Sequence, residues 1–166
     1  MIDVFISHPT PFNKQQIGLL KLIDNKLESN GLNPVNLGKK NWNFKKPLEP
    51  IKKLMSGCKG AIVVGIERHH SLIGYEKEAA TKKSDKTELI HKYSSTPWVQ
   101  IEGGMAYQAG IPLLILKEKK IHPEGILDPN NSDSYVFEFE IEKNWKKLSV
   151  EMERIIENWI DELNIK

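Results

Sequence analysis

The chain has little cysteine and no long apolar run, and each absence excludes a class of protein. Cys58 is the only cysteine among 166 residues, so no internal disulfide can form and a reducing compartment is expected. No apolar stretch is long enough to span a bilayer, and the opening residues lack the basic start and apolar core of a signal peptide. We therefore expect a cytoplasmic protein with a buried, inert cysteine.

An excess of charge of one sign is also missing. The 24 basic and 22 acidic residues leave a formal net charge of +2, which gives no electrostatic footprint for nucleic acid or an anionic membrane. The neighbouring histidines His69 and His70 have no third ligand at a workable spacing, so we expect no metal site. Nucleic acid, membranes and metals are thus not expected as partners.

Short apolar runs alternate with helical patterns along the chain. The expected strands are 4–6, 32–37, 61–66, 113–116 and 135–141, and the expected helices are 14–30, 47–56, one from Thr96 and 145–163. This alternation predicts a single α/β domain over residues 1–166, with a flavodoxin-like open parallel five-stranded sheet, helices on both faces and strand order 2-1-3-4-5. Pro34 places the second strand at or near an edge.

A charged insertion at about 67–95 interrupts this alternation. It is far longer than the usual connection of about 2–6 residues, and it is rich in Lys, Glu, Ser and Thr. The alternatives are an extra helix, a lid that gates the crevice, a partly disordered loop, or simply a solvated insertion.

One carboxylate stands alone on the helix that follows the insertion. Ser95 or Thr96 can cap this helix, and a proline suits its first turn. Between Trp98 and Leu116, Glu102 is the only ionisable side chain apart from a weakly acidic tyrosine. An isolated acid on an apolar helix is either a cost to stability or a functional group. We predict that Glu102 is catalytic, with a solvated or structural acid as the alternative.

Ligands of open parallel sheets bind beyond the carboxyl ends of the strands, where the strand order reverses. That point lies here between the first and third strands, and the start of the Glu102 helix should face it. The predicted substrate-binding residues are Ser7, His8, Phe12, Gly65, Arg68, Trp98 and Gly103. The adjacent glycines Gly103 and Gly104 indicate a close approach to the backbone, either by a ligand or by a neighbouring strand. A loop cap at Ser7, a core role for Trp98 and a surface role for Arg68 are the plain alternatives.

Two families are similar to this chain. The opening run Asp3-Val4-Phe5-Ile6-Ser7-His8 resembles the first strand of Toll/interleukin receptor (TIR) domains. Trp98, followed four residues later by Glu102, resembles the motif that carries the essential acid of enzymatic TIR domains. The resemblance extends from Met1 to about Leu116, but the loop at 37–44 lacks the usual acidic and Pro-Gly pattern and the insertion is long. It implies cleavage of the nicotinamide–ribose bond of NAD, with a linear or cyclic product, as in antiviral defence.

The second family shares the same helix. The run Glu102-Gly103-Gly104-Met105-Ala106-Tyr107, with Gly110-Ile111-Pro112 after it, resembles the signature of nucleoside 2-deoxyribosyltransferases. In that family the matching glutamate is the nucleophile. Ser7-His8-Pro9 is similar to that family's first loop, although no Asp-rich segment for the base and the sugar hydroxyls is found. Both families cleave N-glycosidic bonds.

Three functions follow, with NAD cleavage first. The alternatives are a nucleoside or nucleotide N-glycosidase or 2-deoxyribosyltransferase, and a non-catalytic module that binds a nucleotide or self-assembles. NAD would be a substrate, so no cofactor is expected, and a homo-oligomer is one expected assembly. The phosphates of NAD would need donors, for which the sequence offers backbone N–H groups after Ser7, the guanidinium of Arg68, and Lys39 and Lys40.

Overall fold

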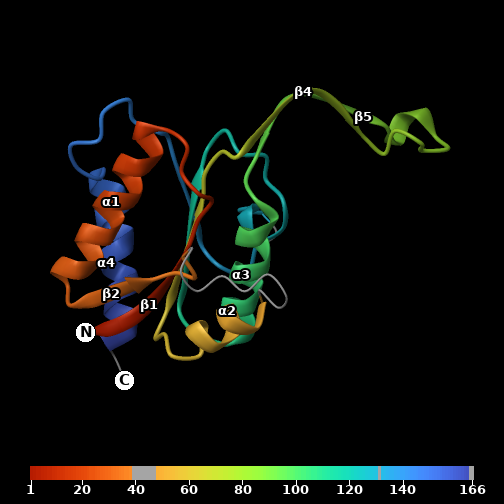
Figure 1. The fold of residues 1–166 in the computed structure, drawn as a ribbon. Helices are drawn as coiled ribbons and strands as arrows, with labels where there is room; N and C mark the ends of the chain where they lie inside the picture. Colours follow the sequence, from red (N-terminus) through yellow and green to blue (C-terminus); the bar gives the residue numbers. More distant parts are fainter. Residues whose placement is uncertain (39–47, 131, 165–166) are drawn as a thin grey trace.

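A parallel sheet of five strands, in the order β2-β1-β3-β6-β7, forms the centre of the molecule (Figure 1). The computed structural model describes residues 1–38, 48–130 and 132–164. The strands of this sheet are β1 (Ile2–Ser7), β2 (Leu32–Val35), β3 (Ala61–Gly65), β6 (Leu113–Glu118) and β7 (Val136–Phe139). The predicted fold class and strand order are confirmed, and β2, which contains Pro34, lies at an edge.

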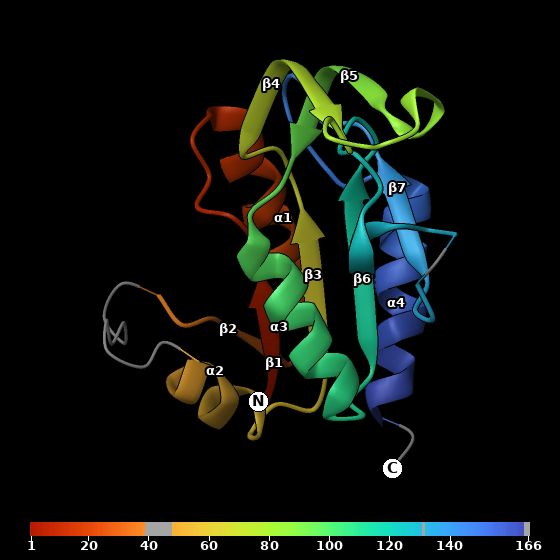
Figure 2. The same ribbon diagram turned by 90° about the vertical axis from the view of Figure 1, so that its right-hand side faces the viewer.

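Helices cover both faces of the sheet, as predicted. They are α1 (Lys14–Ser29), α2 (Leu48–Met55), α3 (Pro97–Gln108) and α4 (Val150–Asn164). Helices α1 and α4 lie on one face, and α2 and α3 lie on the other (Figures 1 and 2). Every residue of β3 is buried, because a central strand between two helical layers has no solvent-facing side.

Cys58 is buried as well, and burial together with the Asp3 carboxylate raises the pKa of its thiol to about 11.

The insertion forms an antiparallel hairpin that projects from the body of the molecule (Figure 1). Its strands are β4 (His69–Glu76) and β5 (Thr87–Ser94), so the alternative of an extra helix is wrong. β-Branched and aromatic residues favour this ribbon, and Ile73 pairs directly with Ile90. Both side chains are about two-thirds exposed, at 67% and 64%. Their exposure explains why a search for buried periodicity does not find these strands.

Two element ends differ from the prediction for identifiable reasons. Helix α4 begins at Val150 rather than at Trp145, because the Ser149 hydroxyl accepts a hydrogen bond from the Met152 N–H at 3.2 Å and caps the helix there. Trp145 lies before the helix and packs against Gly18 of α1. Strand β6 continues past its apolar run to Glu118, because the ammonium group of Lys117 is buried in an ion pair. No helix within the described ranges is long and apolar enough to cross a membrane.

Candidate active site

A cavity of about 810 Å³ opens at the carboxyl end of β1, where the strand order of the sheet reverses. Residues 8–11 of the β1–α1 loop form one wall and residues 36–38 after β2 form another. The lining also includes Arg68, which follows β3, and Trp98 and Glu102 of α3. The cavity therefore lies at the point that the strand order predicts.

Glu102 is held in this cavity by the last residue of β1. The Ser7 hydroxyl is buried and donates a hydrogen bond to Oε2 of the Glu102 carboxylate. Burial raises the pKa of Glu102 above its ordinary value of 4.5, and the hydrogen bond from Ser7 lowers it by less. Because the Ser7 hydroxyl fixes one oxygen of this half-buried carboxylate, Glu102 keeps a defined orientation in the cavity wall.

The start of α3 explains how Trp98 and Glu102 reach the same wall. The Thr96 hydroxyl caps the helix by accepting from the Trp98 N–H at 3.4 Å, and Pro97 occupies the first turn, as predicted. Val99 and Ala106 are buried on the side of α3 that faces the core. Trp98 and Glu102, which are four residues apart, share the neighbouring side and line the cavity together.

The two adjacent glycines of α3 have different surroundings. A Cβ atom on Gly103 would lie 2.8 Å from Cδ1 of Ile126 and 3.2 Å from Cγ2 of Val63 on β3. No atom lies within 4 Å of a Cβ built on Gly104. The close approach at Gly103 therefore comes from protein packing, the second of the two predicted alternatives, and Gly103 does not line the cavity.

A matched pair of substitutions tests this distinction. Gly103→Ala should lower the free energy of unfolding by about 1–3 kcal/mol, because the methyl group overpacks the helix–sheet interface. Gly104→Ala should raise it by roughly 0.5–1 kcal/mol, because alanine favours the helix and meets no neighbour. Urea denaturation of both variants measures the difference, and equal effects of the two substitutions would contradict the packing explanation.

Of the four remaining predicted residues, two line the cavity and two are not in its lining. His8 lines it, and its Nδ1 donates to the Pro9 carbonyl at 2.8 Å, so this nitrogen carries the proton. Arg68 lines the cavity and is exposed. Phe12 is 51% exposed and is not in the lining. Gly65 is covered by Leu127, whose Cδ2 would be 2.8 Å from an added Cβ, so this glycine serves packing.

Sequence reasoning missed two buried polar residues beside the site. Gln16 on α1 and Glu118 at the end of β6 are only 2% and 3% exposed. A glutamine within the apolar stripe of α1, four residues before Leu20, was an available signal for the first. Among the described residues no group of three metal ligands is found.

Comparison with known proteins supports the fold described above. No protein-family model matches this sequence, and no curated protein matches it. A solved structure does match. It is the CMP N-glycosidase BcmB of Clostridium botulinum, at 13% identity and a TM-score of 0.52, with 96% of this chain and 98% of that chain covered. At this identity the similarity shows a shared fold over nearly the whole length of both chains.

Proposed function

We propose that the protein hydrolyses the N-glycosidic bond of a nucleoside 5′-monophosphate, with Glu102 as the carboxylate that faces the sugar. The observation that carries this proposal is the position of Glu102, half-buried in the cavity wall beside Trp98 and held by the Ser7 hydroxyl. The similarity to BcmB, whose name describes it as a CMP N-glycosidase, supports the same class of reaction.

The chemistry needs a carboxylate at this place. As the bond between C1′ and the base nitrogen breaks, its electron pair leaves with the base and the sugar acquires oxocarbenium character. An ionised Glu102 stabilises this cation or captures it covalently. The oxygen of a water molecule then bonds to C1′, and where Glu102 had bonded to C1′ that ester bond breaks and frees the carboxylate. One water proton stays on the new C1′ hydroxyl and the other ends on the base. The products are the free base and a sugar 5-phosphate.

The charges at the cavity favour a monophosphate over NAD. Within the part of the lining that the structure describes, Arg68 is the one permanently cationic side chain. A single guanidinium suits one phosphate, whereas the pyrophosphate of NAD calls for more donors. Lys39 and Lys40, the other predicted cationic phosphate donors, lie outside the described residues. Cleavage of NAD, the activity expected of a TIR-like enzyme, therefore becomes the second candidate function, after hydrolysis of a monophosphate.

A substrate panel tests the proposal. The purified protein is incubated with ribo- and deoxyribonucleoside monophosphates, with the corresponding nucleosides and with NAD, and kcat/KM is measured by chromatography of the released bases. We expect at least one monophosphate to exceed both its nucleoside and NAD. If kcat/KM is highest for NAD, NAD replaces a nucleoside monophosphate as the proposed substrate. A protein without activity on the whole panel would contradict the proposal.

The pH dependence of the reaction reports on Glu102. The carboxylate must be ionised to stabilise a cation, and its pKa is raised above 4.5, so activity should fall on acidification at a pH above that value. Replacement Ser7→Ala removes the hydrogen bond that lowers this pKa, so the acid limb of kcat/KM should move to still higher pH. An acid limb at the same pH in both proteins would show that another group governs it.

A further inference from the structure

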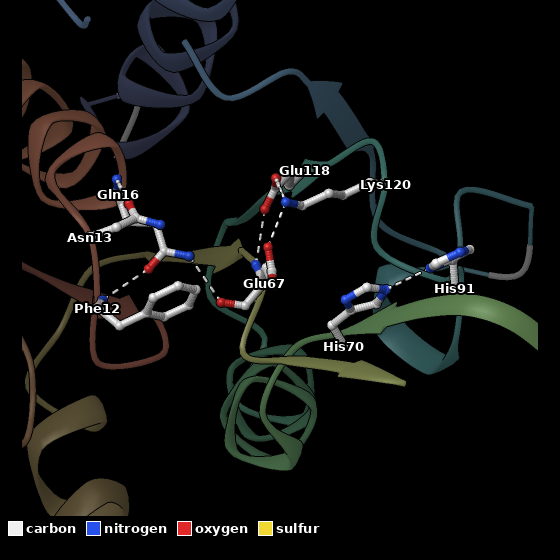
Figure 3. A network of polar contacts seen from close by, with 8 residues as sticks. All are labelled: Phe12, Asn13, Gln16, Glu67, His70, His91, Glu118 and Lys120. Carbon is white, nitrogen blue, oxygen red and sulfur yellow. Dashed lines mark hydrogen bonds and ion pairs between the residues drawn. The ribbon is translucent and has the colours of Figure 1, made fainter. Parts of the chain in front are cut away.

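A network of polar contacts centres on Glu67, the residue directly before Arg68 (Figure 3). The Glu67 N–H donates to Oε2 of Glu118 at 2.9 Å, and the Glu67 carbonyl accepts from Nε2 of Gln16 at 2.9 Å. The next N–H, that of Arg68, donates to the Ser94 carbonyl at 2.9 Å. Three successive backbone groups, the N–H and carbonyl of Glu67 and the N–H of Arg68, are thus hydrogen-bonded where the chain leaves β3. Arg68, which lines the cavity, is part of this segment.

Gln16 joins the two loops that border the cavity. Its Oε1 accepts from the N–H of Phe12 at 3.1 Å, at the end of the loop that supplies His8 to the cavity wall. Its Nε2 bonds to the Glu67 carbonyl on the other side. The side chain is 2% exposed, so water does not readily replace either partner. One buried amide therefore sets the spacing between the His8 loop and the Arg68 turn.

Glu118 and Lys120 hold Glu67 from the opposite direction. Nζ of Lys120 lies 3.1 Å from Oε1 of Glu118 and 2.5 Å from Oε2 of Glu67. Partial burial lowers the pKa of Lys120, but the hydrogen bonds and charges of the two carboxylates outweigh this and raise it. The ammonium group thus stays charged and cancels the repulsion between the two acids. Burial of Glu118 at 3% exposure keeps its bond to the Glu67 N–H out of water.

We propose that Gln16 and Glu118 are positioning residues that hold Arg68 at the cavity and so set the affinity for the phosphate of the substrate. This inference rests on the proposed function. An exposed arginine on a loose turn must lose backbone and side-chain freedom when it binds a phosphate, and a fixed turn removes the backbone part of that cost. Loss of either support should therefore weaken phosphate binding and leave the chemistry at Glu102 almost unchanged.

The test separates binding from chemistry with two substrates that differ only by the phosphate. For Gln16→Met and Glu118→Gln, kcat and KM are measured on the best monophosphate and on its nucleoside. We expect Gln16→Met to raise KM for the monophosphate roughly tenfold and to leave kcat within about twofold. Glu118→Gln should act in the same direction but less, because an amide oxygen still accepts from the Glu67 N–H. Neither variant should change the kinetics on the nucleoside.

A double-mutant cycle with Arg68→Ala excludes a merely structural role. If Gln16 acts through Arg68, then Gln16→Met should have no further effect on KM for the monophosphate once Arg68 is alanine. The matched control is Glu157→Gln, which removes the exposed ion-pair partner of Lys26 and is not part of the Glu67 network. This variant should keep the wild-type KM for both substrates.

The outcomes that overturn the inference differ from those that overturn the function. If Gln16→Met raises KM equally for the nucleoside and the monophosphate, Gln16 only stabilises the fold. The same conclusion follows if Gln16→Met raises KM for the monophosphate equally in the wild-type and Arg68→Ala backgrounds. If Gln16→Met does not fold, Glu118→Gln decides the question by the same comparison. A wild-type protein that neither binds nor cleaves either substrate would overturn the proposed function and the inference with it, whereas an active wild type with unchanged variants would overturn the inference alone.

Discussion

Replacement of Glu102 by glutamine should lower kcat by about 10³-fold or more, with little change in melting temperature. Glutamine keeps the size of the side chain and can still accept the hydrogen bond from Ser7. It loses the negative charge that opposes the developing sugar cation. Because burial disfavours the charged form, removal of the charge should not destabilise the fold.

The matched control is Glu157→Gln, on α4 and far from the cavity lining. Glu157 is exposed and forms an ion pair with Lys26, so the same chemical change should leave kcat near the wild-type value. Steady-state assays of both variants, with circular dichroism to follow unfolding, make the comparison. Full activity in Glu102→Gln would remove Glu102 from the mechanism, and loss of the fold would make it a structural acid.

Replacement of Arg68 by alanine should raise KM for a nucleoside monophosphate roughly 10- to 100-fold, the effect of losing a charged hydrogen bond. The corresponding nucleoside has no phosphate, so its KM should stay close to the wild-type value. Lys82→Ala is a suitable control, because it removes a cation of the same insertion at the tip of the hairpin, away from the cavity.

Saturation curves for the monophosphate, its nucleoside and NAD with both variants measure this difference. If KM rises equally for the nucleoside and the monophosphate in Arg68→Ala, Arg68 acts on the structure of the cavity rather than on the phosphate. If Arg68→Ala raises KM only for NAD, the guanidinium binds the pyrophosphate, and NAD cleavage replaces monophosphate hydrolysis as the proposed function.

The fold was predictable because its central strands are buried on both sides. Continuous apolar runs such as 61–66 are typical of a parallel strand covered on both sides, and the helices between them carry apolar stripes. The hairpin of β4 and β5 was not predictable in this way, since side chains such as Ile73 and Ile90 are exposed and leave no pattern of burial. Its pairing depends on cross-strand contacts that the sequence does not display.

The candidate site was predictable in part for a related reason. The rule that ligands bind where the strand order reverses places Ser7, His8 and Arg68 near Glu102, and the structure brings them together. The glycines were harder, because the side chains that cover Gly65 and Gly103 come from residues 126 and 127, far along the chain. Such long-range packing cannot be inferred from local spacing.

The central claim is that the bond between C1′ and the base breaks, and a measurement that identifies the broken bond tests it most directly. One-dimensional proton NMR of wild-type protein with a nucleoside monophosphate follows the anomeric proton on C1′ during the reaction. We predict that the nucleotide C1′ signal decays while signals of the free base and of a sugar 5-phosphate appear in equal amounts, and that none of this occurs with Glu102→Gln. Release of inorganic phosphate with the C1′ signal of the nucleoside intact, or an unchanged spectrum at high protein concentration, would contradict the account.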